Sequence, residues 1–387
     1  MPDEATTIVL APDGVLAGST ILPSGWVRVH GGVIVEVGAG DAPEGAQRYA
    51  GILVPGFVDV HTHGALGHDF GSADTEGIRA AIAHHVRRGT TTLVASVATA
   101  PLDVLAERVA TLGALVRNGE IAGIHIEGPY LSAGHRGAHA MDLLRTPDVD
   151  EVRRLLEIAP GTVRMVTIAP ELPGARDVIR FLVSEGVTVA IGHTSCTARR
   201  AQAAFDWGAT MVTHAYNGMP SLHHREAGPL GAAIVDDRVT VELILDGHHV
   251  GREAVEVIRR AAGTRLALVS DAMAATGLGD GEYSIAGSPV VVRDGVAMLS
   301  DGSSLAGSTI TLADGLGRLL MEHGASLTQA VAAATTTPAA ALRLPEPFIR
   351  RGSPADLVLL RGAVLSGVMR GGRWVSPPGG SQAAGAT

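Results

Sequence analysis

Histidines and carboxylates follow apolar stretches at several points in this sequence, and their types and spacing could do chemistry. A strand that only packs would end in Val, Ile or Leu, whereas these stretches end in groups that bind protons and metals. If the groups converge on one place, their burial would be costly unless a divalent cation compensated for it. The set comprises four histidines and two carboxylates, namely His61, His63, His193, His214, Glu127 and Asp271.

Three of these residues would make a catalytic metal site. Glu127, His193 and His214 supply the three protein ligands that a catalytic zinc commonly takes, with a further position left for water. Nitrogen and oxygen ligands without thiolates are more typical of a catalytic than of a structural site. Each residue alone has a plainer explanation, as a hydrogen-bonded core histidine or a salt-bridged barrel carboxylate. It is the whole set that favours a metal.

His61 and His63 are separated by one residue, so a strand would place both imidazoles on the same face. Taken alone this spacing is weak evidence, because imidazole suits hydrogen bonding as well as zinc. Asp271 is the candidate general base, since a carboxylate beside a bound water can accept its proton and return it to the leaving group. The alternatives for Asp271 are a metal ligand or the N-cap of the following helix.

The elements that would position these residues alternate between strand-like and helix-like patterns. This alternation predicts parallel βαβ units, and eight of them predict an α/β fold, a (β/α)₈ barrel of the TIM type, with its site at the carboxyl ends of the strands. A doubly wound open sheet is the alternative, which the lack of a glycine-rich dinucleotide fingerprint after the first strand disfavours. The predicted strands are residues 56–63, 90–97, 121–128, 163–170, 187–194, 209–216, 239–246 and 266–273.

Helical spacing between these strands is clearest at residues 77–88, 102–116, 175–185 and 197–207. His84 and His85 lie in the first of these outer helices and are expected to face solvent. After the eighth strand, residues 280–300 predict an inserted hairpin, and residues 309–324 and 327–341 predict two closing helices.

Both ends of the chain are rich in β-type residues and turn signals, which predicts a small β-sandwich domain built from both termini. This domain would comprise residues 1–53 and 342–376, beside a barrel of residues 54–341. Residues 377–387, PPGGSQAAGAT, are predicted to be a disordered tail. The expected terminal strands are residues 7–10, 26–30, 33–37, 356–360, 363–369 and 373–375.

Composition excludes several classes of function. The 387 residues are 46% hydrophobic and carry a net charge of −9, which argues against both wholesale disorder and a basic surface for nucleic acid. With 3% aromatic residues, a stacking platform for single strands is also disfavoured. The one cysteine, Cys196, fits a reducing compartment and is expected to be a small buried side chain. The sequence shows neither a signal-peptide pattern nor a membrane-length apolar run, so we expect a cytoplasmic protein without membrane or nucleic-acid partners.

Seven segments in this order resemble the amidohydrolase superfamily and, within it, the N-acetylglucosamine-6-phosphate deacetylases: PGFVDVHTHG, HIEGPYL, GHT, THAYNGM, DGHHV, VSDAM and LAGS. The first segment is typical of the whole superfamily, whereas HIEGPYL together with THAYNGMP is more specific. The resemblance lies between Val54 and Asp314 and implies a metal-dependent barrel with a small second domain. It also implies hydrolysis of the acetamide of N-acetylglucosamine 6-phosphate to glucosamine 6-phosphate and acetate, in amino-sugar catabolism and cell-wall recycling.

The resemblance further implies a role for each matching residue. Asp271 would act as base and then as acid, and His139 would polarise the acetamide carbonyl. The expected metal is Zn²⁺, with one or two ions per subunit and Fe, Mn or Co as alternatives. In the family the residue that matches Arg225 reaches across a dimer interface, which implies a homodimer. The implied ligands are Glu127, His193 and His214 for the principal ion, with His61 and His63 for a second ion bridged by Glu127. The implied substrate-binding residues are Asn217, Gly218, Arg225, His249, Ala138, Ala306, Gly307 and Ser308.

Two other kinds of function remain open. A deacetylase of N-acetylgalactosamine 6-phosphate, or another N-acyl amidohydrolase, would use the same metal site. The residues assigned to phosphate, Asn217, Arg225 and His249, favour a sugar phosphate but do not separate epimers at C4. The remaining alternative is a catalytically silent barrel that serves as an interaction protein, which the presence of every expected ligand and of Asp271 disfavours.

Overall fold

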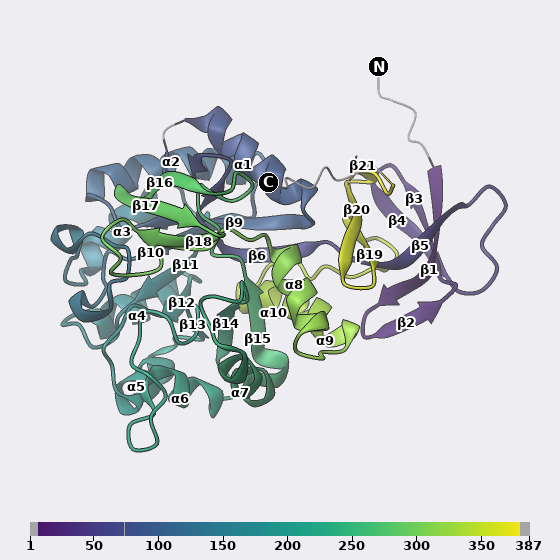
Figure 1. The fold of residues 1–387 in the computed structure, drawn as a ribbon. Coiled ribbons are helices and arrows are strands. Elements are labelled where there is room, and N and C mark those ends of the chain that lie inside the picture. Colours follow the sequence, from purple (N-terminus) through teal and green to yellow (C-terminus); the bar gives the residue numbers. More distant parts are fainter. Residues whose placement is uncertain (1–6, 73, 380–387) are drawn as a thin grey trace.

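The computed structural model describes residues 7–72 and 74–379, and its larger part is a nearly closed barrel of eight parallel strands (Figure 1). The strands lie side by side in chain order, from β6 to β15. This arrangement confirms the predicted (β/α)₈ architecture. The barrel strands are β6 (Phe57–Thr62), β9 (Thr90–Ala98), β10 (Gly123–Glu127), β11 (Val163–Ile168), β12 (Thr188–Ile191), β13 (Met211–Val212), β14 (Thr240–Ile244) and β15 (Leu266–Val269).

The barrel closes between β15 and β6 through hydrogen bonds made at and beyond the carboxyl ends of these strands. The backbone N–H of Asp271 donates to the carbonyl of His61 at 2.9 Å, and that of His63 donates to the carbonyl of Ala272 at 2.7 Å. Strands β6 and β10 are buried along their whole length, as parallel strands covered on both faces are. The closure therefore holds two predicted ligands beside the candidate base.

Several barrel strands stop earlier than the sequence predicts, because the backbone turns at the polar residues that follow. His193, His214 and Asp271 all have positive φ angles, of 46°, 26° and 47°. Residues other than glycine rarely adopt this region, at a cost of about 1–3 kcal/mol each. The predicted strand 209–216 is thereby reduced to two residues. The same turns leave all three side chains facing the mouth of the barrel.

Helices cover the outside of the barrel, and those named from the sequence begin and end close to their predicted bounds (Figure 1). Each turns an apolar stripe toward the strands. In α2 the buried residues Leu105, Val109 and Leu112 recur at intervals of four and three. The helices are α1 (Thr75–Arg87), α2 (Leu102–Arg117), α3 (Val149–Ile158), α4 (Ala175–Ser184), α5 (Ala198–Trp207), α6 (Gly228–Ile234) and α7 (Arg252–Ala262).

The expectation that His84 and His85 face solvent is wrong. His85 lies on the buried stripe of α1 with Ile78 and Ala81, and His84 is only partly exposed. His85 Nε2 donates to the carbonyl of Gly64 at 3.0 Å. Burial lowers the pKa of His85 to about 4, so the imidazole is neutral and ties α1 to the chain that follows β6.

Of the two predicted closing helices, one forms as expected and the other is interrupted. Helix α8 (Leu312–Met321) begins with a capping box between Thr311 and Asp314. The predicted helix 327–341 is instead two helices, α9 (Leu327–Ala333) and α10 (Thr336–Ala341). Thr335 between them has a non-helical φ of −140° and ψ of −85°. Pro338 explains the break, because proline lacks the N–H that a continuous helix requires but fits the first turn of a new one.

Strands from both ends of the chain form the predicted small β domain, as one hydrogen-bonded sheet of eight strands (Figure 1). The sheet has its own core, which includes Leu10, Leu53 and Leu359. Strand β5 leads directly into β6 through Gly56, where a Cβ atom would lie 2.1 Å from Thr91 Oγ1, so only glycine fits. The strands are β1 (Thr7–Ala17), β2 (Thr20–Pro23), β3 (Trp26–His30), β4 (Val33–Gly38), β5 (Gln47–Pro55), β19 (Leu357–Arg361), β20 (Val364–Arg370) and β21 (Arg373–Ser376).

The predicted hairpin at 280–300 is a three-stranded sheet formed by β16 (Gly281–Ile285), β17 (Ser288–Arg293) and β18 (Val296–Leu299). A shorter hairpin, β7 (Gly64–Ala65) with β8 (His68–Asp69), follows β6. Residues 380–387 of the predicted disordered tail lie outside the described residues. Across the part of the chain that the structure describes, no helix has both the length and the apolar character needed to cross a membrane.

Candidate active site

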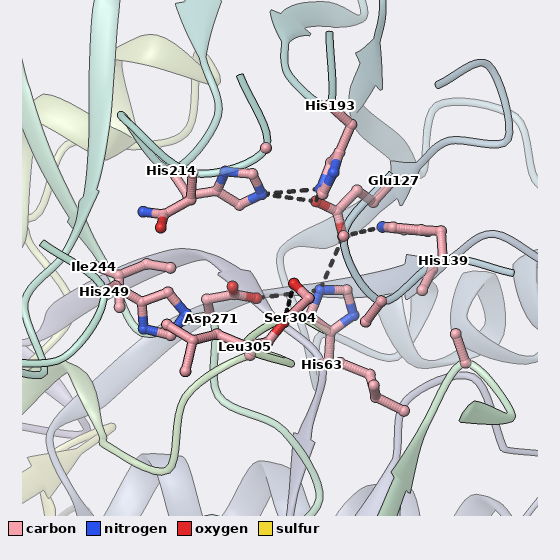
Figure 2. A pocket seen from close by; sticks show the side chains of 18 residues that line it. His63, Glu127, His139, His193, His214, Ile244, His249, Asp271, Ser304 and Leu305 are labelled. Carbon is pink, nitrogen blue, oxygen red and sulfur yellow. Dashed lines mark hydrogen bonds and ion pairs between the residues drawn. The ribbon is translucent and has the colours of Figure 1, made fainter. Parts of the chain in front are cut away.

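A cavity of about 170 Å³ opens at the carboxyl ends of the barrel strands (Figure 2). Its wall brings together residues that lie far apart in the chain, including most of those predicted to form a site. Ile285, at the end of β16, and Ala286, in the turn that follows it, also line the wall. The predicted site residues that line the cavity are His63, Glu127, Ala138, His139, His193, His214, Asn217, Gly218, His249, Asp271 and Gly307.

Glu127, His193 and His214 converge from the carboxyl ends of β10, β12 and β13, with β11 lying between the first two strands. The Nε2 atoms of His193 and His214 lie 3.0 and 3.2 Å from Glu127 Oε1, and 3.0 Å from each other (Figure 2). Hydrogen bonds can satisfy at most two of these three contacts, because each ring nitrogen carries either a proton or a lone pair. A divalent cation shared by the three atoms would satisfy all of them, so this donor set fits a metal.

His61 and His63 form a second group of donors with Glu127 and Asp271. The Nε2 atoms of the two histidines are 3.2 Å apart. Each lies within 3.6 Å of a Glu127 oxygen and within 3.5 Å of Asp271 Oδ1. His61 is fully buried behind the wall of the cavity, whereas His63 is part of it. Glu127 therefore lies between the two groups and contacts both.

Hydrogen bonds behind the rings direct histidine lone pairs toward Glu127. His193 Nδ1 donates to the carbonyl of His135 at 2.9 Å, so Nε2 of the neutral ring keeps its lone pair. His61 Nδ1 lies 3.1 Å from Glu242 Oε2 in a comparable arrangement. Metal-binding histidines typically make such bonds with the ring nitrogen that does not bind the metal. These contacts fit a divalent cation held by imidazole nitrogens and carboxylate oxygens.

The carboxylates favour positive charge in this part of the cavity. Burial opposes a charge on His63, but hydrogen bonds with Asp271 and Glu127 outweigh it and raise the pKa of His63 to about 9. Burial also opposes a charge on Asp271, yet attraction to His61 and His63 holds its pKa well below the ordinary value. Asp271 is therefore ionised at neutral pH and able to accept a proton.

His139 is held as a neutral hydrogen-bond donor in the cavity wall. The backbone N–H of Thr99 donates to His139 Nδ1 at 3.3 Å, and Thr99 Oγ1 lies 2.8 Å from the same nitrogen. Because an amide N–H only donates, Nδ1 is an acceptor and the ring proton lies on Nε2. That atom faces Glu127 Oε2 at 3.5 Å (Figure 2). Burial lowers the pKa of His139 to about 4, so this form persists at neutral pH.

His249 lies in the cavity on the same side as Asp271 (Figure 2) and is positioned by Asp246. His249 Nδ1 lies 2.7 Å from Asp246 Oδ2, and Asp246 Oδ1 accepts the backbone N–H groups of His248 and His249 at 2.8 and 2.9 Å. Burial opposes a charge on His249, but the bond to Asp246 outweighs it and raises the pKa of His249. The same bond outweighs burial at Asp246 and lowers its pKa to about 2. His249 is thus suited to binding an anion.

The other predicted substrate-binding residues are divided between the cavity and the surface. Ala138, Asn217, Gly218 and Gly307 line the cavity. Arg225 does not line it, because in this chain it lies in an exposed loop with Nη1 3.0 Å from His224 Nε2.

Ala306 and Ser308 are buried behind the wall instead of lining it. The backbone N–H of Ser308 donates to the carbonyl of Asp271 at 2.7 Å, and its hydroxyl donates to the carbonyl of Ser270 at 2.5 Å. Ser304, Leu305 and Gly307 provide the lining from this segment. Ser308 therefore positions the backbone of Asp271.

Four polar residues that support the site are absent from the sequence-based prediction: Thr99, His125, Glu242 and Asp246. His125 is buried between Ser96 Oγ at 2.9 Å and Thr167 Oγ1 at 2.8 Å, and its ring packs edge-on against His61. A charged residue inside the apolar stretch 239–246 was a visible signal for Glu242. For Thr99, His125 and Glu242 the sequence carries no signal of the partner, because their contacts join distant segments of the chain. Asp246, in contrast, bonds to His249 only three residues further on.

Cys196 is buried as the sequence predicts. Burial raises the pKa of its thiol to about 12, so the sulfur is protonated and unreactive at neutral pH.

The chain matches the profile of the amidohydrolase family over residues 52–375. Among curated proteins it is similar to the N-acetylglucosamine-6-phosphate deacetylase of Vibrio furnissii, with 36% identity over 294 residues that cover 75% of this chain and 73% of the relative. It is also similar to the N-acetylgalactosamine-6-phosphate deacetylase of Escherichia coli O157:H7, with 34% identity over 76% of this chain and 78% of the relative.

This chain is also similar to solved structures over nearly its whole length. The N-acetyl-D-glucosamine-6-phosphate deacetylase of Mycobacterium smegmatis has a TM-score of 0.92 and 43% identity, covering 95% of this chain and 100% of that one. A mutant of the Mycobacterium smegmatis enzyme in complex with N-acetyl-D-glucosamine-6-phosphate has a TM-score of 0.93 and 42% identity, covering 96% of this chain and 100% of that one. The similarity thus includes the small β domain as well as the barrel.

Proposed function

The chain belongs to the amidohydrolase family, and we propose that it hydrolyses the acetamide of N-acetylglucosamine 6-phosphate to glucosamine 6-phosphate and acetate. The observation that carries this proposal is the convergence of Glu127, His193 and His214 beside an ionised Asp271 in one cavity. The deacetylases among the similar proteins support the same substrate class.

A divalent cation would be held by Glu127, His193 and His214, and we propose Zn²⁺ as that ion because the ligands are imidazole and carboxylate. When bound, such an ion lowers the pKa of water and polarises an amide carbonyl. The protein's own contribution is to direct the Nε2 lone pair of His193 at the site through its bond to His135.

Asp271 would move the proton in both halves of the reaction. Its carboxylate is ionised and lies in the cavity wall, so it can accept a proton from the attacking water. The same carboxyl group then delivers that proton to the departing nitrogen, which leaves as the amine. A covalent acyl-enzyme is not needed, since water is the nucleophile throughout.

His139 would stabilise the negative charge that develops on the acetamide oxygen. Its Nε2–H group faces the cavity, and its other nitrogen is held by Thr99. A donor that is already oriented requires no rearrangement when the carbonyl carbon becomes tetrahedral. Because the pKa of His139 is low, the ring remains a neutral donor across the neutral pH range.

Recognition of the sugar phosphate would fall to Asn217, Gly218 and His249 from this chain. We propose that Arg225, exposed in this chain, reaches the neighbouring active site of a homodimer and binds phosphate there. The net charge of −9 does not prevent this, because a local donor outweighs distant charges that salt screens. We also propose a cytoplasmic location, since the single cysteine fits a reducing compartment. The proposed reaction would serve amino-sugar catabolism and cell-wall recycling.

A panel of three substrates tests the proposed function. We expect the highest kcat/KM for N-acetylglucosamine 6-phosphate, a lower value for the galactose epimer, and a large loss for unphosphorylated N-acetylglucosamine. A preference for the galactose epimer would favour the second candidate, which the relative from Escherichia coli O157:H7 supports. Equal activity on the unphosphorylated sugar would refute the phosphate assignment. If the purified protein contained no divalent metal, and no added divalent metal activated it, the result would favour a catalytically silent barrel.

A further inference from the structure

Glu242 is a carboxylate on β14 with no exposed surface, inside the barrel below the cavity. Burying a charge is costly unless specific partners offset the lost hydration, so a buried glutamate in a strand requires an explanation. Glu242 is absent from the cavity lining, so direct contact with the substrate does not provide that explanation.

One oxygen of Glu242 makes both of its hydrogen bonds. Oε2 lies 3.1 Å from His61 Nδ1 and accepts the backbone N–H of His214 at 3.2 Å. The carboxylate accepts a hydrogen bond from Nδ1–H, and in the neutral ring that can bind a metal this leaves the lone pair of His61 on Nε2. That lone pair faces the oxygens of Glu127 and Asp271, at 3.6 and 3.5 Å.

The negative charge of Glu242 is what a purely structural role would not require. A neutral acceptor would satisfy the backbone N–H of His214 equally well. A carboxylate behind an imidazole, in contrast, fixes the tautomer and makes the other nitrogen a stronger metal ligand. Asp59 provides a comparison in the same barrel, because it is equally buried but bonds to no imidazole. It accepts the backbone N–H groups of His61 and Ser270, both at 3.3 Å, and a hydrogen bond from the Ser270 side chain.

We propose that Glu242 is the positioning residue that makes His61 a metal ligand, and that it thereby sets the affinity of a second cation position formed by His61, His63, Asp271 and Glu127. This inference rests on the metal dependence in the proposed function. It concerns the number of ions that the chain holds and how tightly it holds them. A strong Glu242–His61 bond makes the second position competent. At the first position Glu242 touches only the backbone N–H of His214, which a neutral oxygen would accept as well, and the ring of His193 is held by the carbonyl of His135.

Zinc binding to the full chain at buffered free-metal concentrations tests the proposal. Bound Zn²⁺ is counted by elemental analysis after equilibrium dialysis, with no substrate present. We expect two ions per wild-type chain. Glu242→Gln keeps the shape and an oxygen for the His214 N–H but removes the charge. We expect this substitution to weaken binding of the second ion by about 10–100-fold, the range seen when a hydrogen-bond partner of a metal ligand is removed. The affinity for the first ion should not change.

Two further variants make the result specific. Asp59→Asn removes an equally buried carboxylate that does not touch an imidazole, and both ions should remain. His61→Ala should lose the second ion, and adding Glu242→Gln to it should produce no further loss if the two residues act as one unit.

The proposal would be overturned if Glu242→Gln bound both ions like the wild type, or if it weakened both ions equally. Additive effects of the two substitutions, or a wild-type chain that binds one ion at every zinc concentration, would overturn it as well. Because the readout is binding of zinc alone, a failure of the proposed deacetylase activity would be recognised separately, in the substrate panel.

Discussion

The substitution Asp271→Asn tests the role of the Asp271 carboxylate in proton transfer separately from its other contacts. Asp271→Asn keeps an oxygen close to the place where Oδ1 lies within 3.5 Å of both His61 and His63. The ligands of the principal ion, Glu127, His193 and His214, are untouched, so binding of that ion and of the substrate should persist. The amide cannot accept a proton, however, and the proposed reaction needs this group twice, once as base and once as acid.

The expected loss is large and falls on kcat. Positioned acid–base groups contribute about 10²–10⁴-fold. Since Asp271 acts in both halves of the reaction, we expect kcat to fall by about 10³–10⁴-fold, or roughly 4–5 kcal/mol of transition-state stabilisation, at 1.36 kcal/mol per tenfold. KM should change little, because the proposed role of Asp271 is proton transfer in the transition states and not binding of the substrate.

The assay is the steady-state release of acetate from N-acetylglucosamine 6-phosphate, with metal content and thermal midpoint measured on the same preparations. Asp59→Asn is the matched control, because Asp59 is buried in the same barrel but does not line the cavity. It should retain near-normal turnover. If Asp271→Asn kept its metal and turned over within tenfold of the wild type, the assignment of Asp271 as base and acid would be refuted.

Three further predictions concern other parts of the molecule. Arg225→Ala should raise KM for the phosphorylated sugar with little change in kcat, and an unchanged KM in steady-state kinetics would make it an ordinary loop arginine. Since Asp246 raises the pKa of His249, a cationic His249 binds phosphate best below that pKa, and KM should rise as pH increases through it. Asp246→Asn should move this rise to lower pH, and an identical KM–pH profile would exclude the charge of His249 from phosphate binding. Leu105→Ala, at a fully buried position of α2, should lower the free energy of unfolding by about 2–5 kcal/mol in urea titrations, whereas a change below about 1 kcal/mol would contradict the packing described for α2.

The barrel was predictable because its signal is local and repeated. Eight apolar stretches with helical spacing between them leave few alternatives, and the small β domain followed from the β-type residues at both ends. The burial of His85 was predictable in principle as well. Its spacing from Ile78 and Ala81 places it on the apolar stripe of α1, which outweighs the polar character of a single histidine.

Contacts between strands were beyond the reach of the sequence. Nothing in the pattern shows that Glu242 faces His61, or that Thr99 fixes the tautomer of His139, because these pairs depend on which side chains meet inside the closed barrel. The early strand ends have a related cause. Positive φ at His193 and His214 is strain that the surrounding fold imposes, and residue type alone predicts the opposite.

The central claim is that one divalent ion is held where Glu127, His193 and His214 converge. An anomalous-scattering map of zinc-supplemented crystals, recorded at the metal edge, tests it directly. We predict a peak within bonding distance of Glu127 Oε1 and of both Nε2 atoms, beside Asp271. A map without a peak at this point, in crystals whose zinc is bound elsewhere, would contradict the claim and the proposed hydrolysis with it.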